Sequence, residues 1–302
     1  MQKIIALSAL TILVAGCPAK DAPVESAVPA EAEAAAPAEA EAPAPASVAT
    51  AAADIQWALF NPEQPDGPQL SPIAGNMKEG AFTALVKLPA GHASPLHTHP
   101  ASFIGVGLTG TIQNGRSAED NSTITVGTTW TEPANEVHFT GCTEEAECTF
   151  VAYMDGAIGM TAAEAAAEGE MAMTVMAAAD LAWEPINPEA PDGPQMVVVG
   201  GDKATGPFQA LVQFPGGAAS PPHSHKASYG GAVVSGTMGD GGDVTYGAGS
   251  TWTHIADEVH VTACVSEEPC LFFASMDGAF SMVPAEEPAE APAEAAEEAP
   301  AE

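Results

Sequence analysis

"SPLHTHPASF" (residues 94–103) and "SPPHSHKASY" (residues 220–229) place a His-x-His pair behind a proline twice in one chain, at an offset of 126 residues. In an extended segment, alternate side chains project from the same face, so the two imidazoles of each pair can reach one point. The recurrence of so specific a stretch indicates that the chain contains two copies of one structural unit.

The similarity extends to both sides of these stretches. "DIQWALFNPEQPDGPQL" from Asp54 matches "DLAWEPINPEAPDGPQM" from Asp180, and "GTTWTEPANEVHFTGC" from Gly127 matches "GSTWTHIADEVHVTAC" from Gly249. The offset falls to 122 between these blocks because a loop around "RSAEDNST" is longer in the first copy. Such a length difference marks a surface connection. We therefore predict two domains of one fold, residues 54–160 and 180–282.

Within each copy, short runs such as "FTALVKLP" and "CTFVAYM" alternate or cluster apolar and β-favouring residues between glycines and prolines. This pattern predicts an all-β fold, with one antiparallel sandwich or barrel per copy. The joining segment, residues 161–179, begins with a Thr-x-x-Glu capping pattern and predicts a linker that is partly helical.

A third histidine recurs in register with each His-x-His pair, inside the pattern Trp-Thr-x-x-Ala-[Asn/Asp]-Glu-Val-His. Three neutral imidazoles that meet at one point suit a divalent metal and leave coordination positions open. The alternative, histidines that hydrogen-bond in a pocket without metal, is less favoured because the whole set occurs twice. The predicted ligands are His97, His99, His138, His223, His225 and His260. His92 and His254 have no counterpart, and we expect them on the surface.

These residues carry a resemblance to the cupin superfamily. The first cupin motif, built around His-x-His, lies over residues 91–110 and 217–236, and the second lies over residues 127–138 and 249–260. "GDKATGPFQALVQFPGG", "HSHKASYGGAVVSG" and "DEVHVTACVSEEPC" further resemble a group of double-cupin proteins catalogued only as a domain of unknown function. The resemblance implies two tandem cupin-type barrels (double-stranded β-helix or jelly roll) with a metal-type pocket in each.

One departure from the cupin pattern bears on the metal. Phe103 and Tyr229 stand where metal-binding cupins usually carry glutamate, four residues after the second histidine. The sites therefore resemble the three-histidine iron sites of cysteine dioxygenase and acetylacetone dioxygenase more than the manganese site of germins. We expect Fe or Zn, with Mn, Cu or Ni as alternatives.

The same two positions make the copies unequal. Tyr229 is a candidate proton donor or, alternatively, an aromatic wall of the pocket, whereas Phe103 can only be wall. If one copy is catalytic, the second is favoured. Trp130 and Trp252 are expected to line the pocket or the core.

Each copy also has a Cys-x5-Cys pair directly after its third histidine: Cys142 with Cys148, and Cys264 with Cys270. An even, repeated pair in an exported protein predicts a disulfide in each copy. The alternative is ligation of a soft metal, because Cys142 and His138 share a strand face.

The N-terminus "MQKIIALSALTILVAGC" has the form of a bacterial lipoprotein signal, with an apolar run too short to span a bilayer comfortably. We expect residues 1–17 to act as a lipoprotein signal that is cleaved before Cys17, with lipidation of Cys17, which in a Gram-negative host places the protein at the periplasmic face of the outer membrane. Residues 18–53 are expected to form an Ala/Pro/Glu-rich linker and residues 283–302 an acidic, disordered tail.

The formal net charge of −33 does not come from the chain ends alone, because residues 54–282 contain 27 of the 40 acidic and 5 of the 7 basic residues. A body of this sign repels phosphate backbones, so nucleic acid is excluded as a partner. The membrane is expected as a partner only through the lipid anchor.

We therefore expect a membrane-anchored extracytoplasmic double cupin with a mononuclear three-histidine metal site in each barrel. Its expected activity is oxygen-dependent or hydrolytic chemistry on a small molecule, with a metal-dependent, dioxygenase-like oxidoreductase as the expected class. The alternatives are a non-catalytic protein that binds a small ligand or a metal, and a structural envelope role. The sequence leaves open whether barrels pair within one chain or in a homodimer.

Overall fold

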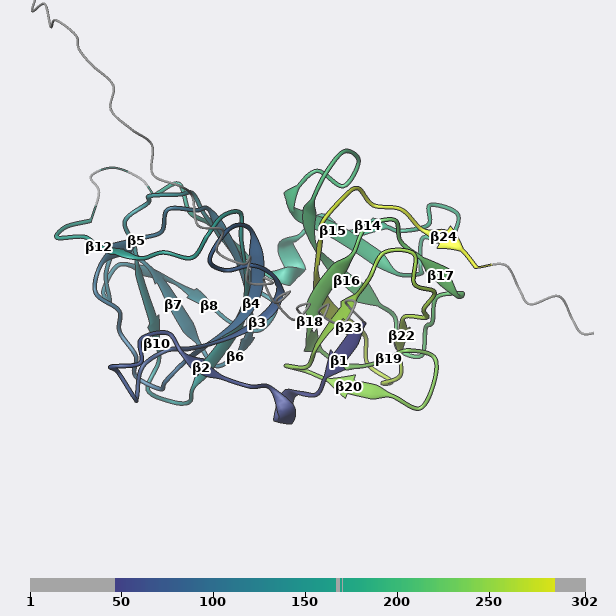
Figure 1. The fold of residues 1–302 in the computed structure, drawn as a ribbon, viewed down its shortest axis with the longest axis horizontal. Coiled ribbons are helices and arrows are strands. Elements are labelled where there is room, and N and C mark those ends of the chain that lie inside the picture. The colour runs from purple at the N-terminus through teal and green to yellow at the C-terminus, as the bar shows by residue number, and fades with distance from the viewer. Residues whose placement is uncertain (1–46, 167–168, 170, 286–302) are drawn as a thin grey trace, which may run out of the picture. The chain divides into compact units, whose positions relative to one another are not determined.

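Each repeat folds into a β-barrel, as the apolar runs predict (Figure 1). The computed structural model describes residues 47–166, 169 and 171–285. Within these residues no α-helix is present, and the two helical turns are the 3₁₀ segments η1 (Ala52–Asp54) and η2 (Ala178–Asp180). The expected signal, Cys17 and most of the linker lie outside the described residues.

The first barrel has three antiparallel sheets. A seven-stranded sheet has the spatial order β13 (Thr174–Met176), β9 (Thr129–Glu132), β6 (Phe103–Thr109), β11 (Cys148–Met154), β4 (Phe82–Leu88), β3 (Gln69–Gly75) and β2 (Ala58–Leu59). A three-stranded sheet is formed by β10 (Phe139–Cys142), β7 (Ile112–Gly115) and β8 (Asn121–Ile124). A two-stranded ribbon is formed by β12 (Thr161–Ala162) and β5 (His97–Thr98).

The second barrel repeats this arrangement strand for strand. Its seven-stranded sheet has the order β1 (Val48–Thr50), β21 (Thr251–His254), β18 (Tyr229–Ser235), β23 (Cys270–Met276), β16 (Phe208–Phe214), β15 (Gln195–Gly201) and β14 (Glu184–Pro185). The three-stranded sheet contains β20 (Thr245–Gly247), β19 (Thr237–Gly239) and β22 (Ala263–Cys264). The ribbon contains β17 (His223–Ser224) and β24 (Val283–Pro284).

The two copies exchange their first strands. β1 precedes the first copy in the chain but pairs with β21 of the second barrel, and β13 precedes the second copy but pairs with β9 of the first. Each exchanged strand covers a sheet edge that would otherwise present unpaired backbone groups. The barrels therefore associate within one chain.

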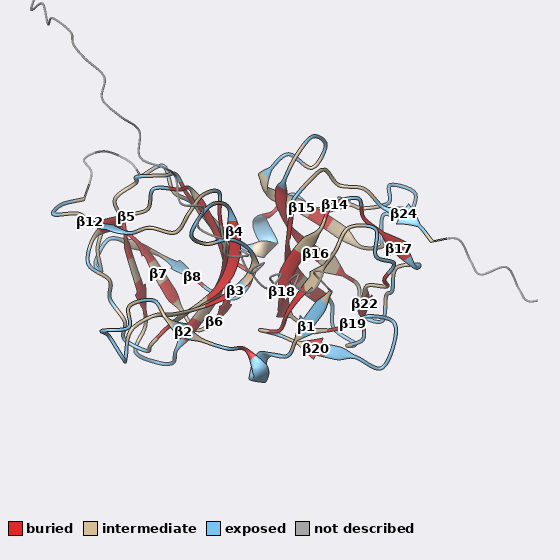
Figure 2. Ribbon diagram, viewed as in Figure 1, coloured by how far each residue is buried: buried red, intermediate tan, exposed pale blue. Residues whose placement is uncertain are grey.

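The longest strands are buried on both faces, which explains their almost continuous apolar sequences (Figure 2). In β4, Phe82 and Ala84 face the interior of the first barrel, whereas Leu85 joins an apolar cluster that also contains Leu211 and Phe273 of the second barrel. This third cluster packs one large sheet against the other. Burial of both faces is the reason that "FTALVKLP" lacks a regular polar alternation.

Residues 161–179, expected to be partly helical, contain no α-helix where the structure describes them, and only the 3₁₀ segment η2 begins within this range. Thr161 and Ala162 form β12, which pairs with β5, and residues 174–176 form β13. The segment has a capping pattern but no apolar stripe that a helix could bury, so pairing with two open strand edges overrides its local preference. β1 lies likewise inside the region expected to be a linker.

The predicted tail begins with structure as well. Val283 and Pro284 form β24 and pair with Ser224 and His223, as β12 pairs with the first His-x-His strand. Each of these ribbons holds a histidine-bearing segment against its barrel. Residues 286–302, the remainder of the predicted tail, lie outside the described residues.

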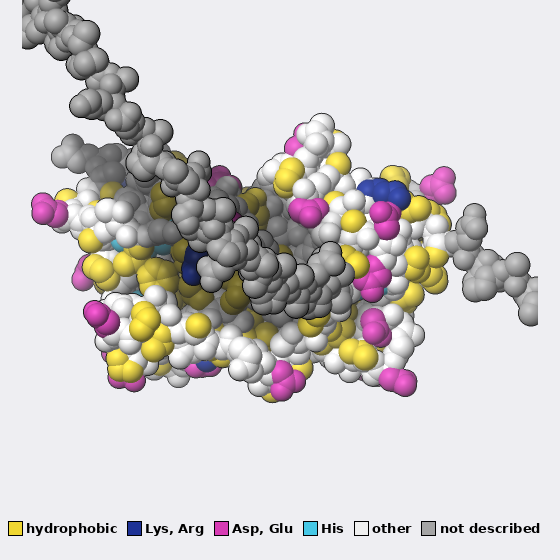
Figure 3. All heavy atoms as spheres, in the orientation of Figure 1, with side chains coloured by type: hydrophobic (Ala, Val, Ile, Leu, Met, Phe, Trp, Pro, Cys, Tyr) yellow, Lys and Arg dark blue, Asp and Glu magenta, His cyan; other side chains and the backbone are white. Residues whose placement is uncertain are grey.

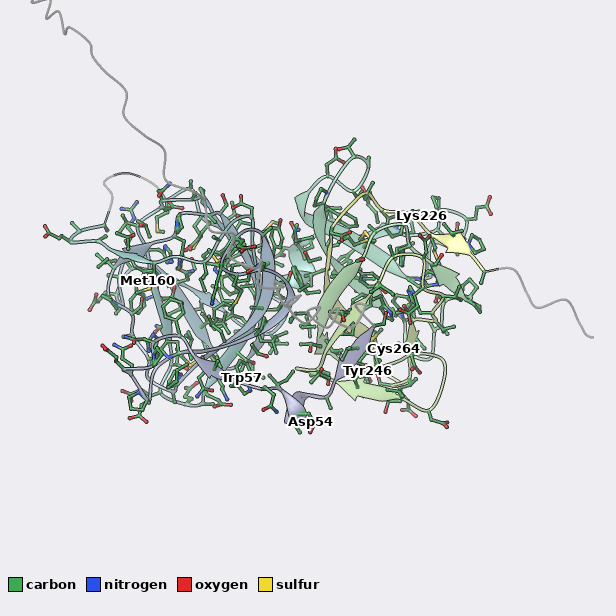
Figure 4. All side chains as sticks on the ribbon, viewed as in Figure 1. Asp54, Trp57, Met160, Lys226, Tyr246 and Cys264 are labelled. Carbon is green, nitrogen blue, oxygen red and sulfur yellow. A yellow bond between two sulfur atoms is a disulfide. The ribbon has the colours of Figure 1, made fainter. Side chains whose placement is uncertain are left out.

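Both predicted disulfides, Cys142–Cys148 and Cys264–Cys270, are present, so the alternative of soft-metal ligation by Cys142 is wrong. Each bridge closes the short loop between the strand that follows the third histidine, in the three-stranded sheet, and the next strand, in the large sheet. The sulfur atoms are buried in the barrel cores, where Cys264 shares its cluster with Tyr246 (Figure 4).

Acidic side chains are spread around the visible surface of both barrels, and basic ones are few (Figure 3). The basic residues also meet acids: Lys203 pairs with Glu184 at 2.9 Å, and Lys226 pairs with Asp257 at 2.5 Å. Among the described residues, no helix is long and apolar enough to cross a membrane.

Candidate metal centres

Strand pairing brings the first and third histidine of each copy opposite one another. His97 donates its backbone N–H to the carbonyl of His138 at 3.0 Å, and His138 donates in return at 2.9 Å. His223 and His260 form the same reciprocal pair at 3.0 and 2.8 Å. Residues that exchange both hydrogen bonds in an antiparallel pair are direct cross-strand neighbours. The backbone thus sets two of the three imidazoles side by side.

The His-x-His spacing adds the third ring. In the first barrel the ring centroids of His97 and His138 lie 4.2 Å apart, and the ring of His99 lies 5.0 and 5.1 Å from them. The corresponding distances among His223, His260 and His225 are 4.4, 4.9 and 5.2 Å. In each triad one nitrogen per ring lies within 4.8 Å of the other two.

Backbone carbonyls orient all six rings. The Nδ1 atom of His97 lies 2.9 Å from the carbonyl oxygen of Pro95, that of His99 lies 2.6 Å from Gly159, and that of His138 lies 3.0 Å from Glu136. A carbonyl only accepts, so each Nδ1 carries the proton and each Nε2 keeps its lone pair.

The second triad is held in the same way. The carbonyls of Pro221 and Glu258 accept from the Nδ1 atoms of His223 and His260 at 2.8 and 3.1 Å, and Ser281 accepts from His225. Metal-binding histidines usually donate their second ring nitrogen to a protein oxygen, which fixes the tautomer and the orientation of the ring. Both triads therefore have the orienting shell of a metal site.

Burial favours the uncharged form of five of the six imidazoles. Desolvation lowers the pKa of His97 and His99, and together with the neighbouring histidines it lowers the pKa of His138 to about 3. Desolvation likewise lowers the pKa of His225 to about 4 and also lowers that of His260. Neutral rings bind a cation without first losing a proton. His138 Nε2 is buried without a hydrogen-bond partner, which fits a nitrogen that faces a metal.

The two positions that replace the usual cupin glutamate adjoin the triads. The ring of Phe103 lies 5.8 Å from that of His99 and 6.1 Å from that of His138, so Phe103 is an apolar wall. The hydroxyl of Tyr229 lies 3.0 Å from His260 Nε2, and burial raises the pKa of Tyr229. The hydroxyl therefore stays protonated and donates a hydrogen bond to His260 Nε2. Tyr229 thus has a polar role beyond that of a pocket wall.

The structure adds a carboxyl group that the sequence analysis missed. Glu132 is 2% exposed, and its Oε2 lies 3.2 Å from Nε2 of His138. Desolvation raises the pKa of Glu132 to about 8, so at neutral pH an uncharged acid faces an uncharged imidazole. The first triad therefore has a fourth polar group against it, contrary to the expectation that the site lacks a carboxylate.

The expectation of a surface position is wrong for His254. Its ring stacks on that of His260 with centroids 4.2 Å apart and an interplanar angle of 16°, and its pKa is lowered to about 4 by desolvation and the neighbouring histidines. His92 is half-buried and takes no part in the first triad. The second site thus has a fourth histidine beside its third ligand.

Trp130 and Trp252 lie behind the sites. The ring of Trp130 packs on Phe103 at 5.8 Å and on Phe150 at 5.1 Å, and it crosses Gly105, where a Cβ would lie 2.3 Å from the ring. Trp252 packs on Phe272 at 5.3 Å. The tryptophans are therefore core residues that support the pocket walls.

One signal in the sequence could have pointed to Glu132 and His254, the two residues that the sequence analysis missed. In the aligned "TWTEPANEVH" and "TWTHIADEVH", Glu132 stands opposite His254 inside a block that is otherwise nearly unchanged. Of the three positions at which the blocks differ, this one carries residues that can both ligate metals. Their approach to the third histidine, however, follows from the strand register and could not be read from the alignment alone.

The barrels and their triads define the molecule as a bicupin, a chain of two tandem cupin barrels. The chain belongs to the family described as Domain of unknown function (DUF4437), whose model matches residues 48–209 and 174–300. Both matches begin at the exchanged strands β1 and β13. A search of curated proteins gave no match.

Solved structures share the fold at low sequence identity. A "putative dioxygenase" from Nostoc punctiforme aligns with a TM-score of 0.60 and 13% identity over 77% of this chain and 82% of that one. An oxalate decarboxylase from Lactobacillus farciminis aligns with a TM-score of 0.52 and 12% identity over 82% and 90%, and one from Bacillus subtilis with 0.51 and 15% over 80% and 79%. At such identities the likeness shows the bicupin fold alone.

Proposed function

We propose that this protein is a metal-dependent enzyme of the cell envelope that oxidises a small molecule in the manner of a dioxygenase. The observation that carries the proposal is the pair of triads whose six Nδ1 atoms are all tied to backbone carbonyls, leaving six Nε2 lone pairs to converge three by three. Histidines that serve only as core residues have no reason to adopt this common tautomer twice.

A divalent metal held by three imidazoles supplies Lewis-acid or redox chemistry at the positions that its protein ligands leave open. Around it, the protein excludes water and manages protons. Phe103 closes one side of the first site, and the hydroxyl of Tyr229 holds a proton 3.0 Å from a ligand nitrogen of the second. Tyr229 is thus placed to pass a proton to a bound substrate, which supports the second barrel as the catalytic one.

Turnover is favoured over mere binding by the hydroxyl of Tyr229. A protein that only stores a metal or a ligand does not require a protonated hydroxyl against a ligand nitrogen, yet Tyr229 occupies that place in the second barrel. The similarity of fold to a dioxygenase candidate and to decarboxylases is compatible with this reading and leaves the substrate open.

Elemental analysis of purified protein tests the proposal. Wild-type protein grown with Fe, Zn, Mn, Cu and Ni should contain metal in both barrels; H97A/H138A should lose one equivalent, and H223A/H260A the other. H92Q, which changes a histidine outside the triads, is the control. Only trace metal in the folded wild-type protein would overturn the proposal.

Oxygen uptake separates the enzyme from the binding protein. With the metal-loaded protein, candidate thiols, diketones and phenols should support steady oxygen consumption that H223A/H260A abolishes. Full metal occupancy without turnover on any such substrate would favour the non-catalytic alternative.

We further propose that the mature protein is lipid-anchored at Cys17 on the extracytoplasmic side of the membrane. The proposal rests on the apolar run and the "VAGC" sequence before that residue. Mass spectrometry of the mature N-terminus should find a diacylated cysteine, and C17S should release the protein from the membrane fraction. An unprocessed N-terminus would contradict the anchor.

A further inference from the structure

The strand register places Glu132 beside Phe103, the residue that stands at the glutamate position of the first cupin motif. β6 and β9 pair with Phe103 directly opposite Glu132. Side chains of directly opposed residues project to the same face, with Cβ atoms about 5 Å apart. The acid that is missing at position 103 is therefore supplied from the neighbouring strand, on the same side of the sheet.

The carboxyl group of Glu132 lies close enough to the first triad for both to bind the same ion. Oε2 of Glu132 lies 3.2 Å from Nε2 of His138. Two ligand atoms that bind one ion at about 2.1 Å each, at right angles, lie about 3 Å from one another. An ion bound to His138 therefore has this oxygen within reach.

The buried acid has few polar neighbours in the described structure. The side chain of Asn114 and Nε2 of His138 lie against its carboxyl group, but neither carboxyl oxygen and neither polar atom of the Asn114 side chain makes a hydrogen bond of normal geometry. Buried polar groups are almost always well paired, so a carboxyl group of 2% exposure with only these contacts fits a site that takes a cation. A cation between Glu132 and the triad satisfies the carboxyl group and also His138 Nε2.

The second barrel shows what the same backbone does without the acid. There the register pairs Tyr229 with His254, and the imidazole of His254 stacks on the ring of His260. Asp240, the counterpart of Asn114, is exposed at the end of β19. Among the described residues of the second site, no carboxyl group joins the triad.

We propose that Glu132 is a fourth metal ligand in the first barrel, which makes this site three-histidine-one-carboxylate while the second stays an all-nitrogen site. The inference rests on the proposed metal-dependent function and specifies it. Carboxylate oxygens suit hard cations such as Mn²⁺, whereas imidazoles alone suit Zn²⁺, Cu²⁺ or Ni²⁺. The two barrels of one chain thus select different metals.

Titration of Mn²⁺ into metal-stripped, full-length protein tests the assignment. In the H223A/H260A background only the first barrel can bind, and the EPR signal of free Mn²⁺ reports the unbound fraction. E132Q, which keeps the shape of the side chain, should raise the Kd for Mn²⁺ by about tenfold or more. E132D keeps a carboxylate on a shorter side chain, so its Kd for Mn²⁺ should lie between that of the parent and that of E132Q.

The controls separate loss of the ligand from loss of the fold or of the whole function. E144Q, in the exposed loop between β10 and β11 of the same barrel, should bind like its parent, and circular dichroism should show that E132Q is folded. Unchanged Mn²⁺ affinity in folded E132Q would overturn the role of Glu132 and leave the proposed function standing. Absence of metal binding in the folded parent would overturn the proposed function itself.

Discussion

The two barrels share a backbone and differ in the residue that meets the third histidine. The first presents an acid, Glu132, opposite an inert Phe103, whereas the second presents a base, His254, opposite a hydroxyl, Tyr229. In the first barrel the polar group that faces the third histidine is Glu132 of β9. In the second barrel it is the hydroxyl of Tyr229, which belongs to β18. The comparison teaches that a duplicated scaffold can keep its three histidines and change the polar groups around them through two cross-strand neighbours.

The largest expected difference concerns the pH dependence of stability in the metal-free protein. Because the pKa of Glu132 is raised to about 8 in the fold, the unfolded chain gives up this proton at lower pH, and the fold loses stability as pH rises from about 4.5 to 8. E132Q lacks this loss, so relative to wild type it should gain on the order of 3 kcal/mol between pH 5 and 8.

Calorimetry in EDTA across this pH range measures the gain. H254Q, the matched change in the second barrel, should not reproduce it, because His254 has a lowered pKa and its contribution is lost as pH falls below about 6.5. Parallel pH curves for wild type and E132Q would contradict the buried acid.

The disulfides provide a comparison in which the barrels should agree. Each bridge spans the same sequence separation of 6, so C142S/C148S and C264S/C270S should each destabilise the fold by about 2 kcal/mol. Urea denaturation of the metal-free variants measures both values. A much larger loss of stability in one barrel would show that its bridge does more there than close a short loop.

Transfer of the acid should transfer the metal preference. H254E places a carboxyl group at the register position of Glu132, and in the H97A/H138A background it should strengthen Mn²⁺ binding by the second barrel about tenfold. H92E adds the same charge away from the second triad and is the control. No gain in Mn²⁺ affinity would show that the register position alone does not create a ligand.

The smallest effect is expected at the tyrosine. Y229F removes the hydroxyl that engages His260 Nε2, so Zn²⁺ binding by the second barrel should tighten about fivefold, the equivalent of one hydrogen bond. If Tyr229 passes the proton in the reaction, turnover falls while the metal content stays. The reverse change, F103Y, should weaken binding in the first barrel, and calorimetric titration compares the two.

The two barrels, both disulfides and both histidine triads could be predicted from the sequence, whereas the groups beside the triads could not. The duplicated blocks fixed two barrels, the Cys-x5-Cys spacing predicted both disulfides, and the His-x-His pairs with the third histidine predicted both triads. These predictions succeeded because they rest on local spacing that occurs twice. The predictions for residues 161–179 and for the start of the tail failed because their strands form only against partners far away in the chain.

The sequence by itself determined the number of domains, their β character and the six imidazoles, because periodicity and repetition are properties of neighbouring residues. Only the tertiary structure decided that the copies exchange their first strands and that Glu132 and His254 meet the third histidines. Those contacts depend on the strand register, which is set by the packing of whole sheets, and a shift of one residue would turn both side chains to the opposite face.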